Sequence, residues 1–397
     1  MSKVVKSWRA LFGALLLCAL AACSLHSNDP VVFIEEGKPA KLSDWHLLNV
    51  SGMGLELNAG VQPYELNTPL FTDNAHKLRT IWMPGGAGHM PAKYSEKDPF
   101  DFPVGTVITK TFYYPKSDGS LRLTKTVESS ADLLDGRTLD LSRFRLIETR
   151  LLVRRKEGWI ALPYVWNAEQ TEAELSRTGD QAALSLKDEA GKTHAFTYVV
   201  PNENQCASCH VARIKGKELQ PIGLKARHLN RSFTYDGGAT ENQLVHLVKT
   251  GYLTGLPMDG AAVSKDVPKN ADWHDTSATL DARARAYLDI NCAHCHNPVG
   301  AANNTGLNLE PFLPLSRYQG VCKPPVAAGK GTGDHGFGIV PGKPDESIMT
   351  FRLASTEGGI MMPELGRSTV HDDGLKLIRE WIRAMPGSCE DKGTQPQ

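Results

Sequence analysis

The sequence predicts an α+β fold, in which an N-terminal antiparallel β domain, sandwich-like, precedes two mainly α modules. Residues 30–200 contain several short segments rich in β-branched and aromatic residues, and turn residues separate them. Beyond residue 200, apolar residues recur at helical spacing. A five-residue motif occurs twice in this second half, which predicts two modules, at 201–277 and 278–390.

The composition excludes several classes of protein. The chain has 397 residues, enough for two or three domains. It contains 44 Lys and Arg and 44 Asp and Glu, and this balance argues against a polybasic nucleic-acid-binding protein. Hydrophobic residues make up 41% and charged residues 22%, values that are typical of a globular protein.

Residues 1–22 are expected to be a signal peptide, because three basic residues precede an apolar segment that is too short to span a bilayer. The segment ends in Leu20-Ala21-Ala22-Cys23, which resembles the lipobox of bacterial lipoproteins. The resemblance implies cleavage before Cys23 and lipidation of this cysteine. With Ser24 next to it, it also implies an outer-membrane lipoprotein that faces the periplasm. An ordinary cleaved signal is the alternative. Cleavage removes three of the 44 positive charges and none of the negative ones, which leaves the mature chain at −3.

The eight cysteines fall into distinct groups. Cys18 leaves with the signal, Cys23 takes the lipid, and four others form two C-x-x-C pairs. Cys322 and Cys389 remain, and an oxidising periplasm predicts a disulfide between them. Two free buried thiols are the alternative.

Each C-x-x-C pair is followed directly by histidine, in Cys206-Ala207-Ser208-Cys209-His210 and Cys292-Ala293-His294-Cys295-His296. This is the attachment signature of c-type haem. Two thiols three residues apart reach the two vinyl groups on one porphyrin edge, and the adjoining imidazole binds the iron. The motifs therefore predict two covalently bound haem c groups. The attachment residues are Cys206, Cys209, Cys292 and Cys295, and the proximal ligands are His210 and His296.

Three other interpretations of the cysteines remain open. Zinc modules separate their C-x-x-C pairs by about 15–20 residues, whereas 82 residues lie between Cys209 and Cys292. A thioredoxin-like redox pair requires a βαβ pattern, which the sequence lacks. Simple disulfides within each pair leave the two histidines unexplained.

The stretch from about 278 to 388 resembles the class I cytochromes c in its order of helix, C-x-x-C-H, helix, methionine loop and helix. Leu280, Ala284, Tyr287 and Leu288 form the apolar stripe of the first of these helices. The resemblance implies that the methionine before the proline, Met362 rather than Met361, is the sixth ligand of the second iron. Packing in the core is the alternative for both methionines.

The first motif has less regular surroundings. A strand that ends at Pro201 precedes it, and Met258 falls in the loop where a sixth ligand is expected. His228, or a vacant site, is the alternative, and His246 is expected to be an ordinary helix-surface residue. The helix that begins near Thr279 is expected to serve both modules and so to bring the two porphyrins close together.

Over nearly the whole mature chain the sequence is similar to a family of bacterial di-haem c-type cytochrome lipoproteins. The segments that carry this resemblance are the two haem motifs, Pro69-Leu70-Phe71-Thr72-Asp73, Tyr164-Val165-Trp166-Asn167 and Met361-Met362-Pro363-Glu364. The resemblance implies export, a β domain and haem domains, and it implies no substrate.

The expected function is electron transfer by an exported, lipid-anchored di-haem cytochrome. Its partners would be redox proteins and, through the lipid, a membrane, but not nucleic acid. No residue is assigned a catalytic role. A di-haem enzyme such as a peroxidase, with an open first iron, is the main alternative. The other is a cytochrome subunit of a periplasmic dehydrogenase, with a β domain that binds a glycan or a partner.

Overall fold

The computed structural model describes residues 29–85, 90–124, 133–213, 218–326 and 328–389. The expected signal peptide, at residues 1–22, and the lipidation site, Cys23, lie outside these ranges. Within them, no helix combines the length and the apolar character needed to cross a bilayer.

The predicted fold class is wrong. Strands make up 29% of the chain and helices 22%, and a large, curled, mixed sheet dominates the structure in place of two mainly α cytochrome c-like modules. The described part of the chain has six α-helices, and three of them have eight residues or more. Residues 201–277 show the difference best, because they hold three short hairpins. These are β15 (Val211–Arg213) with β16 (Glu218–Leu219), β17 (Ser232–Thr234) with β18 (Thr240–Asn242), and β20 (Met258–Asp259) with β21 (Ala262–Val263).

The large sheet has nine strands in the order β12-β11-β10-β6-β7-β13-β14, with β4 paired to β6 and β3 paired to β4. The strands are β3 (Gln62–Tyr64), β4 (His76–Trp82), β6 (Val107–Ser117), β7 (Ser120–Arg122), β10 (Phe144–Arg155), β11 (Gly158–Trp166), β12 (Ala173–Leu175), β13 (Asp180–Lys187) and β14 (Thr193–Val200). Turn residues between β-rich segments predict one hairpin at Lys156-Glu157-Gly158 and another at residues 188–192, and β10–β11 and β13–β14 confirm both. Because β13 pairs in parallel with β7, the sheet is not purely antiparallel.

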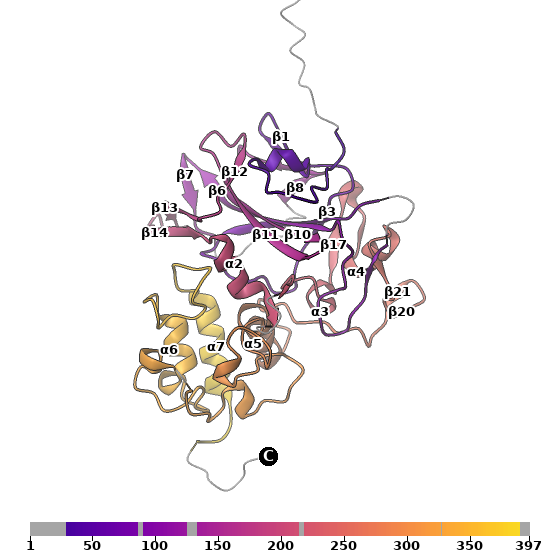
Figure 1. Cartoon of the computed structure of the whole chain (residues 1–397). Helices are drawn as coiled ribbons and strands as arrows, with labels where there is room; N and C mark the ends of the chain where they lie inside the picture. Colours follow the sequence, from indigo (N-terminus) through magenta and orange to yellow (C-terminus); the bar gives the residue numbers. More distant parts are fainter. Residues whose placement is uncertain (1–28, 86–89, 125–132, 214–217, 327, 390–397) are drawn as a thin grey trace, which may run out of the picture.

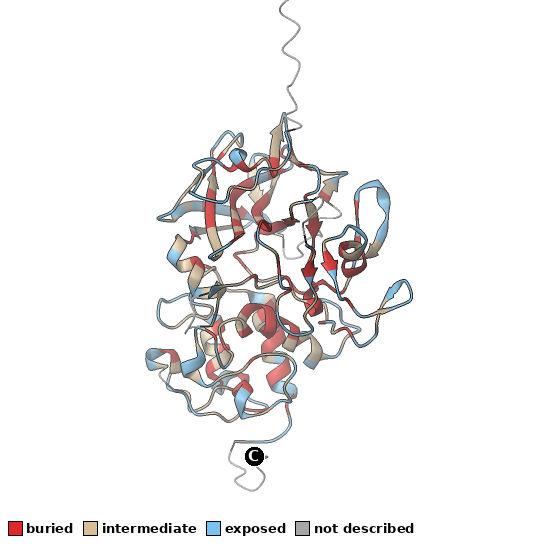
Figure 2. Cartoon of the chain, turned by 45° about the vertical axis from the view of Figure 1, so that its right-hand side comes forward, coloured by how far each residue is buried: buried red, intermediate tan, exposed pale blue. Residues whose placement is uncertain are grey.

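One face of the large sheet packs against a small sheet of β1 (Leu48–Ser51), β2 (Gly54–Leu57), β9 (Thr138–Asp140) and β8 (Leu134–Asp135). Trp45, Leu55, Tyr113 and Tyr164 are fully buried between the two sheets. The red ribbons of Figure 2 show buried residues both in the sheets and in the helices below them. The opposite face of the large sheet looks toward the C-terminal half of the chain.

Helix α2 (Glu203–His210) lies between the large sheet and the C-terminal helices α5 (Leu280–Leu288), α6 (Ile348–Ala354) and α7 (Asp372–Ala384), as Figure 1 shows. These last three helices overlap segments that the sequence predicts as helical, and Tyr287, Ile378 and Trp381 belong to their common core. The two remaining helices, α3 (Ala226–Leu229) and α4 (Gln243–Lys249), pack with β19 (Leu253–Thr254) and β5 (Ala92–Lys93).

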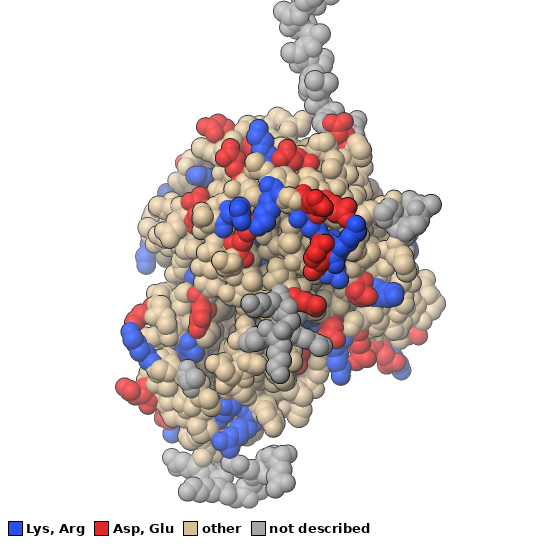
Figure 3. Space-filling model, viewed as in Figure 1, with Lys and Arg blue, Asp and Glu red and all other residues tan. Residues whose placement is uncertain are grey.

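The predicted disulfide is confirmed. Cys322 and Cys389 are bonded, with their Cα atoms 5.2 Å apart, and the bond links the end of the chain's described part to the loop before Ile339. Positive and negative side chains are intermixed on the face shown in Figure 3, as expected for a chain without net charge.

Candidate functional site

The first C-x-x-C-H motif lies on α2, and a capping box fixes the start of this helix. The side chain of Asn202 accepts a hydrogen bond from the Gln205 backbone, and the Gln205 side chain accepts one from the Asn202 backbone. The helix then carries Cys206 and, one turn later, Cys209 and His210. Both thiols and the imidazole therefore sit on one rigid element.

The second motif begins in a π-helical segment, Asp289–Ala293, that continues α5. Such segments are often found at functional sites. The backbone amides of Cys295 and His296 both donate to the Cys292 carbonyl, so the motif closes into a tight turn. The side chain of Asn291 holds this turn by accepting from the Phe71 backbone and donating to the Tyr287 carbonyl.

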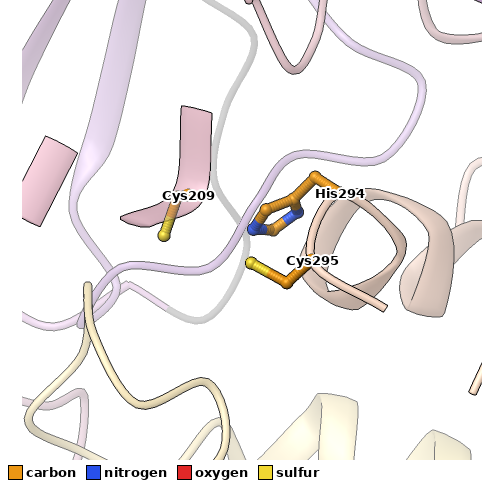
Figure 4. A group of neighbouring side chains, drawn as sticks. All are labelled: Cys209, His294 and Cys295. Atoms are coloured by element: carbon orange, nitrogen blue, oxygen red, sulfur yellow. The ribbon is translucent and has the colours of Figure 1, made fainter. Parts of the chain in front are cut away.

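The two motifs meet. The Sγ atoms of Cys209 and Cys295 and a ring nitrogen of His294 all lie within 4.8 Å of one another. Figure 4 shows these three side chains together. The Cys295 thiol also lies 3.6 Å from the Ser208 carbonyl oxygen, inside the first motif. Residues 85 to 87 positions apart in the chain are thus placed at a single junction between α2 and the second motif.

Both expected proximal histidines have one ring nitrogen occupied in the same way. The Nδ1 of His210 donates to the Gln220 carbonyl over 2.8 Å. The Nδ1 of His296 lies 3.1 Å from the Thr305 hydroxyl, which is itself a donor to the Ala302 carbonyl and therefore accepts from the histidine. Because Nδ1 carries the proton in each ring, Nε2 keeps an unshared lone pair. Metal-binding histidines use this arrangement.

Burial sets the charge of these histidines. It lowers the pKa of both His210 and His296 to about 4, so both imidazoles are neutral at pH 7. Among the thiols, burial raises the pKa of Cys206 and raises that of Cys292 to about 12. The hydrogen bond between Cys209 and Cys295 lowers the pKa of the first thiol and raises that of the second.

Each motif opens onto its own pocket. The first pocket is lined by Cys206, Cys209 and His210 on one side and by the large sheet on the other, and it has about 1460 Å³ of unfilled space, part of it open to solvent. The second, with about 830 Å³, is lined by Cys292 and His296. Met362 lines both pockets, whereas Met361 lines neither. The second pocket also has Met349, which the sequence analysis did not consider.

The loop that carries Met362 is held by two arginines. Arg367, a residue 7% exposed, donates through its guanidinium to the carbonyls of Met362 (2.8 Å), Ser355 (2.8 Å) and Thr369 (2.9 Å). Arg352 donates to the Ile360 carbonyl and accepts from the Met362 backbone amide. The position of Met362 is therefore fixed by hydrogen bonds on both sides of the loop.

The segment Pro69–Asp73, from the β-rich half, docks against this loop and α7. A carboxylate oxygen of Asp73 accepts from the backbone amides of Ser368 and Thr369 and from the Thr369 hydroxyl, each at 2.8 Å. Phe71 stacks on His371, with ring centroids 4.0 Å apart. This segment thus fixes the C-terminal half of the site to the large sheet.

The structure does not bring Met258 to the first pocket. It lies on β20, half-buried against the apolar cluster that contains α3 and α4, and is not among the residues that line either described pocket. His228 is buried beside Asp289 and Asn270, also outside both pockets. His246 stacks on Tyr235 and contacts Glu241. The prediction of Met258 as sixth ligand therefore has no geometric support.

Several residues of the first pocket escaped the sequence analysis. Lys77, Arg79, Lys110 and Arg150 line its sheet side, and His371 lines it from the start of α7. The available signal was the alternation in residues 76–82 and 107–113, which places basic residues at inward positions of strands rich in β-branched, aromatic and other apolar residues.

The residues present fit two haem groups and do not fit a four-cysteine zinc site. Each motif pairs its cysteines with a histidine whose Nε2 is available, next to a largely apolar pocket. Structural zinc has four ligands, whereas the group found among the described residues has three and leaves out Cys206 and Cys292. Among the residues that the structure describes, the buried Nδ1 of His294 has no hydrogen-bond partner.

No protein-family model, no curated protein and no solved structure matches this chain.

Proposed function

We propose that this chain is an exported, lipid-anchored di-haem c-type cytochrome that transfers single electrons. The observation that carries the proposal is the contact between the two C-x-x-C-H motifs, in which Cys209 and Cys295 lie within 4.8 Å of a shared neighbour, His294. Thiols this close, each the anchor of a porphyrin edge, would bring the two macrocycles near enough for direct electron exchange.

In this proposal the bound haem groups supply reversible one-electron chemistry at iron. The protein supplies the rest. Four cysteines hold the groups by thioether bonds, and His210 and His296 bind iron through Nε2 while their Nδ1 atoms stay hydrogen-bonded. Met362 is proposed as the sixth ligand of the second site, because it lines that pocket on a loop fixed by Arg352 and Arg367.

The test uses the mature protein produced with a c-type maturation system. Electron paramagnetic resonance of the oxidised protein is expected to show two low-spin ferric haems that interact magnetically. Met362→Ala is expected to convert one of them to a high-spin form, while the matched change Met361→Ala leaves both unchanged. Two non-interacting signals would contradict the proposed proximity, and a spectrum unaltered by Met362→Ala would contradict the ligand assignment.

A peroxidase-type enzyme is a second candidate, and one observation favours it. Among the residues that line the first pocket, the only methionine is Met362, which also lines the second. If Met362 serves the second site, the sixth position of the first falls to a histidine such as His371 or to a small exogenous molecule. A high-spin ferric signal that shifts on addition of peroxide would favour the enzyme, and two low-spin sites insensitive to peroxide would exclude it.

A further inference from the structure

We propose that a row of basic side chains on the large sheet, Lys77, Arg79, Lys110 and Arg150, is the binding site for the two propionate groups of the haem attached to Cys206 and Cys209. Assigning this cationic row to the propionates rests on the proposed function and adds to it a defined anion site. Its ligand is a pair of carboxylates, and the porphyrin is the source to which the proposal commits.

Strand register places the cations side by side. Arg79 on β4 lies directly opposite Lys110 on β6, and Lys110 lies directly opposite Arg150 on β10. Like charges in such cross-strand positions destabilise a sheet. Three in succession on three neighbouring strands therefore call for an anion that offsets their repulsion.

The carboxylates of the protein supply only part of that compensation. Glu148, fully buried, pairs with Arg150, and Glu65 lies 3.4 Å from Arg79. Neither Lys77 nor Lys110 has a carboxylate oxygen within 4 Å anywhere in the ranges that the structure describes. The row has four cations and two paired carboxylates, so it has an excess of two positive charges. Two propionates carry two negative charges and would neutralise this excess.

The two lysines show the effect of this excess. Burial, reinforced by the neighbouring arginines, lowers the pKa of Lys110 to about 7 and that of Lys77 well below its ordinary value. The Lys77 ammonium donates to the Ala75 carbonyl, and both lysines lie over the ring of Phe112. Asp73 raises the pKa of Lys77 slightly, but one of its carboxylate oxygens already accepts three hydrogen bonds from Ser368 and Thr369.

The cationic row and the attachment cysteines line the same pocket. Cys206, Cys209 and His210 lie on α2, and the basic residues lie on strands of the large sheet, where Ile108 and Leu152 are their apolar neighbours on β6 and β10. A c-type haem has thioether bonds, an apolar macrocycle and two propionates. The pocket offers sulfur, apolar walls and cations for these three parts.

The test measures reduction potentials of the holoprotein. Lys110→Met removes one cation from the row and is expected to lower the potential of one haem, because loss of a nearby positive charge favours the ferric form. A tenfold change in the reduction equilibrium corresponds to about 59 mV for one electron. The other haem should keep its potential. Lys110→Arg retains the charge and should therefore keep the potential close to that of the unsubstituted protein. Arg79→Met should lower the potential of the same haem as Lys110→Met.

Lys156→Met is the matched control, because this lysine is 71% exposed at the far end of the β10–β11 hairpin and lines neither pocket. It should change neither potential. Unchanged potentials in both Lys110→Met and Arg79→Met, with two haems still attached by mass, would overturn this inference and leave the proposed function intact. Loss of all covalent haem from the unsubstituted protein would overturn the proposed function itself.

A free dicarboxylate is the other source of the same chemistry, and succinate is the probe that distinguishes it. If propionates occupy the row, succinate produces no saturable change in the absorption or potential of the unsubstituted holoprotein. A saturable change that Lys110→Met abolishes would assign the row to a soluble anion and overturn the propionate assignment.

Discussion

Arg367 offers the sharpest test of how the protein holds Met362 in place. Its side chain is buried, and its three shortest hydrogen bonds, of 2.8 to 2.9 Å, reach the carbonyls of Met362, Ser355 and Thr369. A hydrogen bond to a charged group contributes about 1.5–3 kcal/mol. Three bonds at the lower end of that range amount to about 4–5 kcal/mol, which places Arg367→Gln among the most destabilising single substitutions.

The assay is urea unfolding of the holoprotein, followed by circular dichroism, together with the spin state of its haems. With a denaturant slope of about 3 kcal/mol per molar, the midpoint should fall by about 1.5 M. The same variant should raise the high-spin fraction of one haem, because the loop no longer holds Met362. The midpoint of Arg367→Lys should lie between those of Arg367→Gln and the unsubstituted protein, since lysine keeps the charge and loses the planar set of guanidinium donors.

Arg379→Gln is the matched control, because this arginine pairs with Asp345 at the surface, where ion pairs contribute little. Its midpoint should stay within about 0.3 M of the unsubstituted protein. If Arg367→Gln behaves like this control in both readouts, Arg367 does not position the methionine loop.

Three further predictions concern the parts that support the site. Asp289→Asn leaves Arg227 buried without its carboxylate and should cost about 3–5 kcal/mol in urea unfolding, and a loss below about 1 kcal/mol would contradict this. Burial would raise the pKa of Asp289, but His228 and Arg227 outweigh it and hold this pKa well below its usual value. The ionised carboxylate therefore contributes stability that is present above about pH 4 and is lost as the pH falls. In Asp289→Asn the unfolding midpoint should accordingly depend less on pH between about pH 5 and pH 3 than in the unsubstituted protein. Replacing Cys322 and Cys389 together by serine should cost about 3–4 kcal/mol, and a reductant should lower the midpoint of the parent protein but not of this variant.

What the sequence could predict was local. The hairpin between β10 and β11 follows from Lys156-Glu157-Gly158 flanked by β-rich segments, and α7 follows from the spacing of its apolar residues. The disulfide followed from counting cysteines in a chain that is expected to be exported. For the hairpin and the helix, the determining residues lie close together in sequence. For the disulfide, only two cysteines remain once the others have been assigned.

What the sequence could not predict depends on contacts between distant segments. The helical modules expected around the motifs gave way to hairpins and irregular chain, because Pro69–Asp73 and the large sheet supply walls that a small helical module would have had to provide itself. The structure does not place Met258 in the first pocket, because β20 packs on the apolar cluster around α3 and α4, and position along the chain did not reveal this. The cationic row is visible only once three strands are in register.

The most direct test of the central claim is the intact mass of the mature protein under denaturing conditions, after production with a c-type maturation system. The account predicts a polypeptide heavier by two iron porphyrins, by only one when Cys206 and Cys209 or Cys292 and Cys295 are replaced by serine, and still by two when Cys322 and Cys389 are replaced. A mass of the polypeptide without any porphyrin, in a preparation where a known c-type cytochrome is matured, would contradict it.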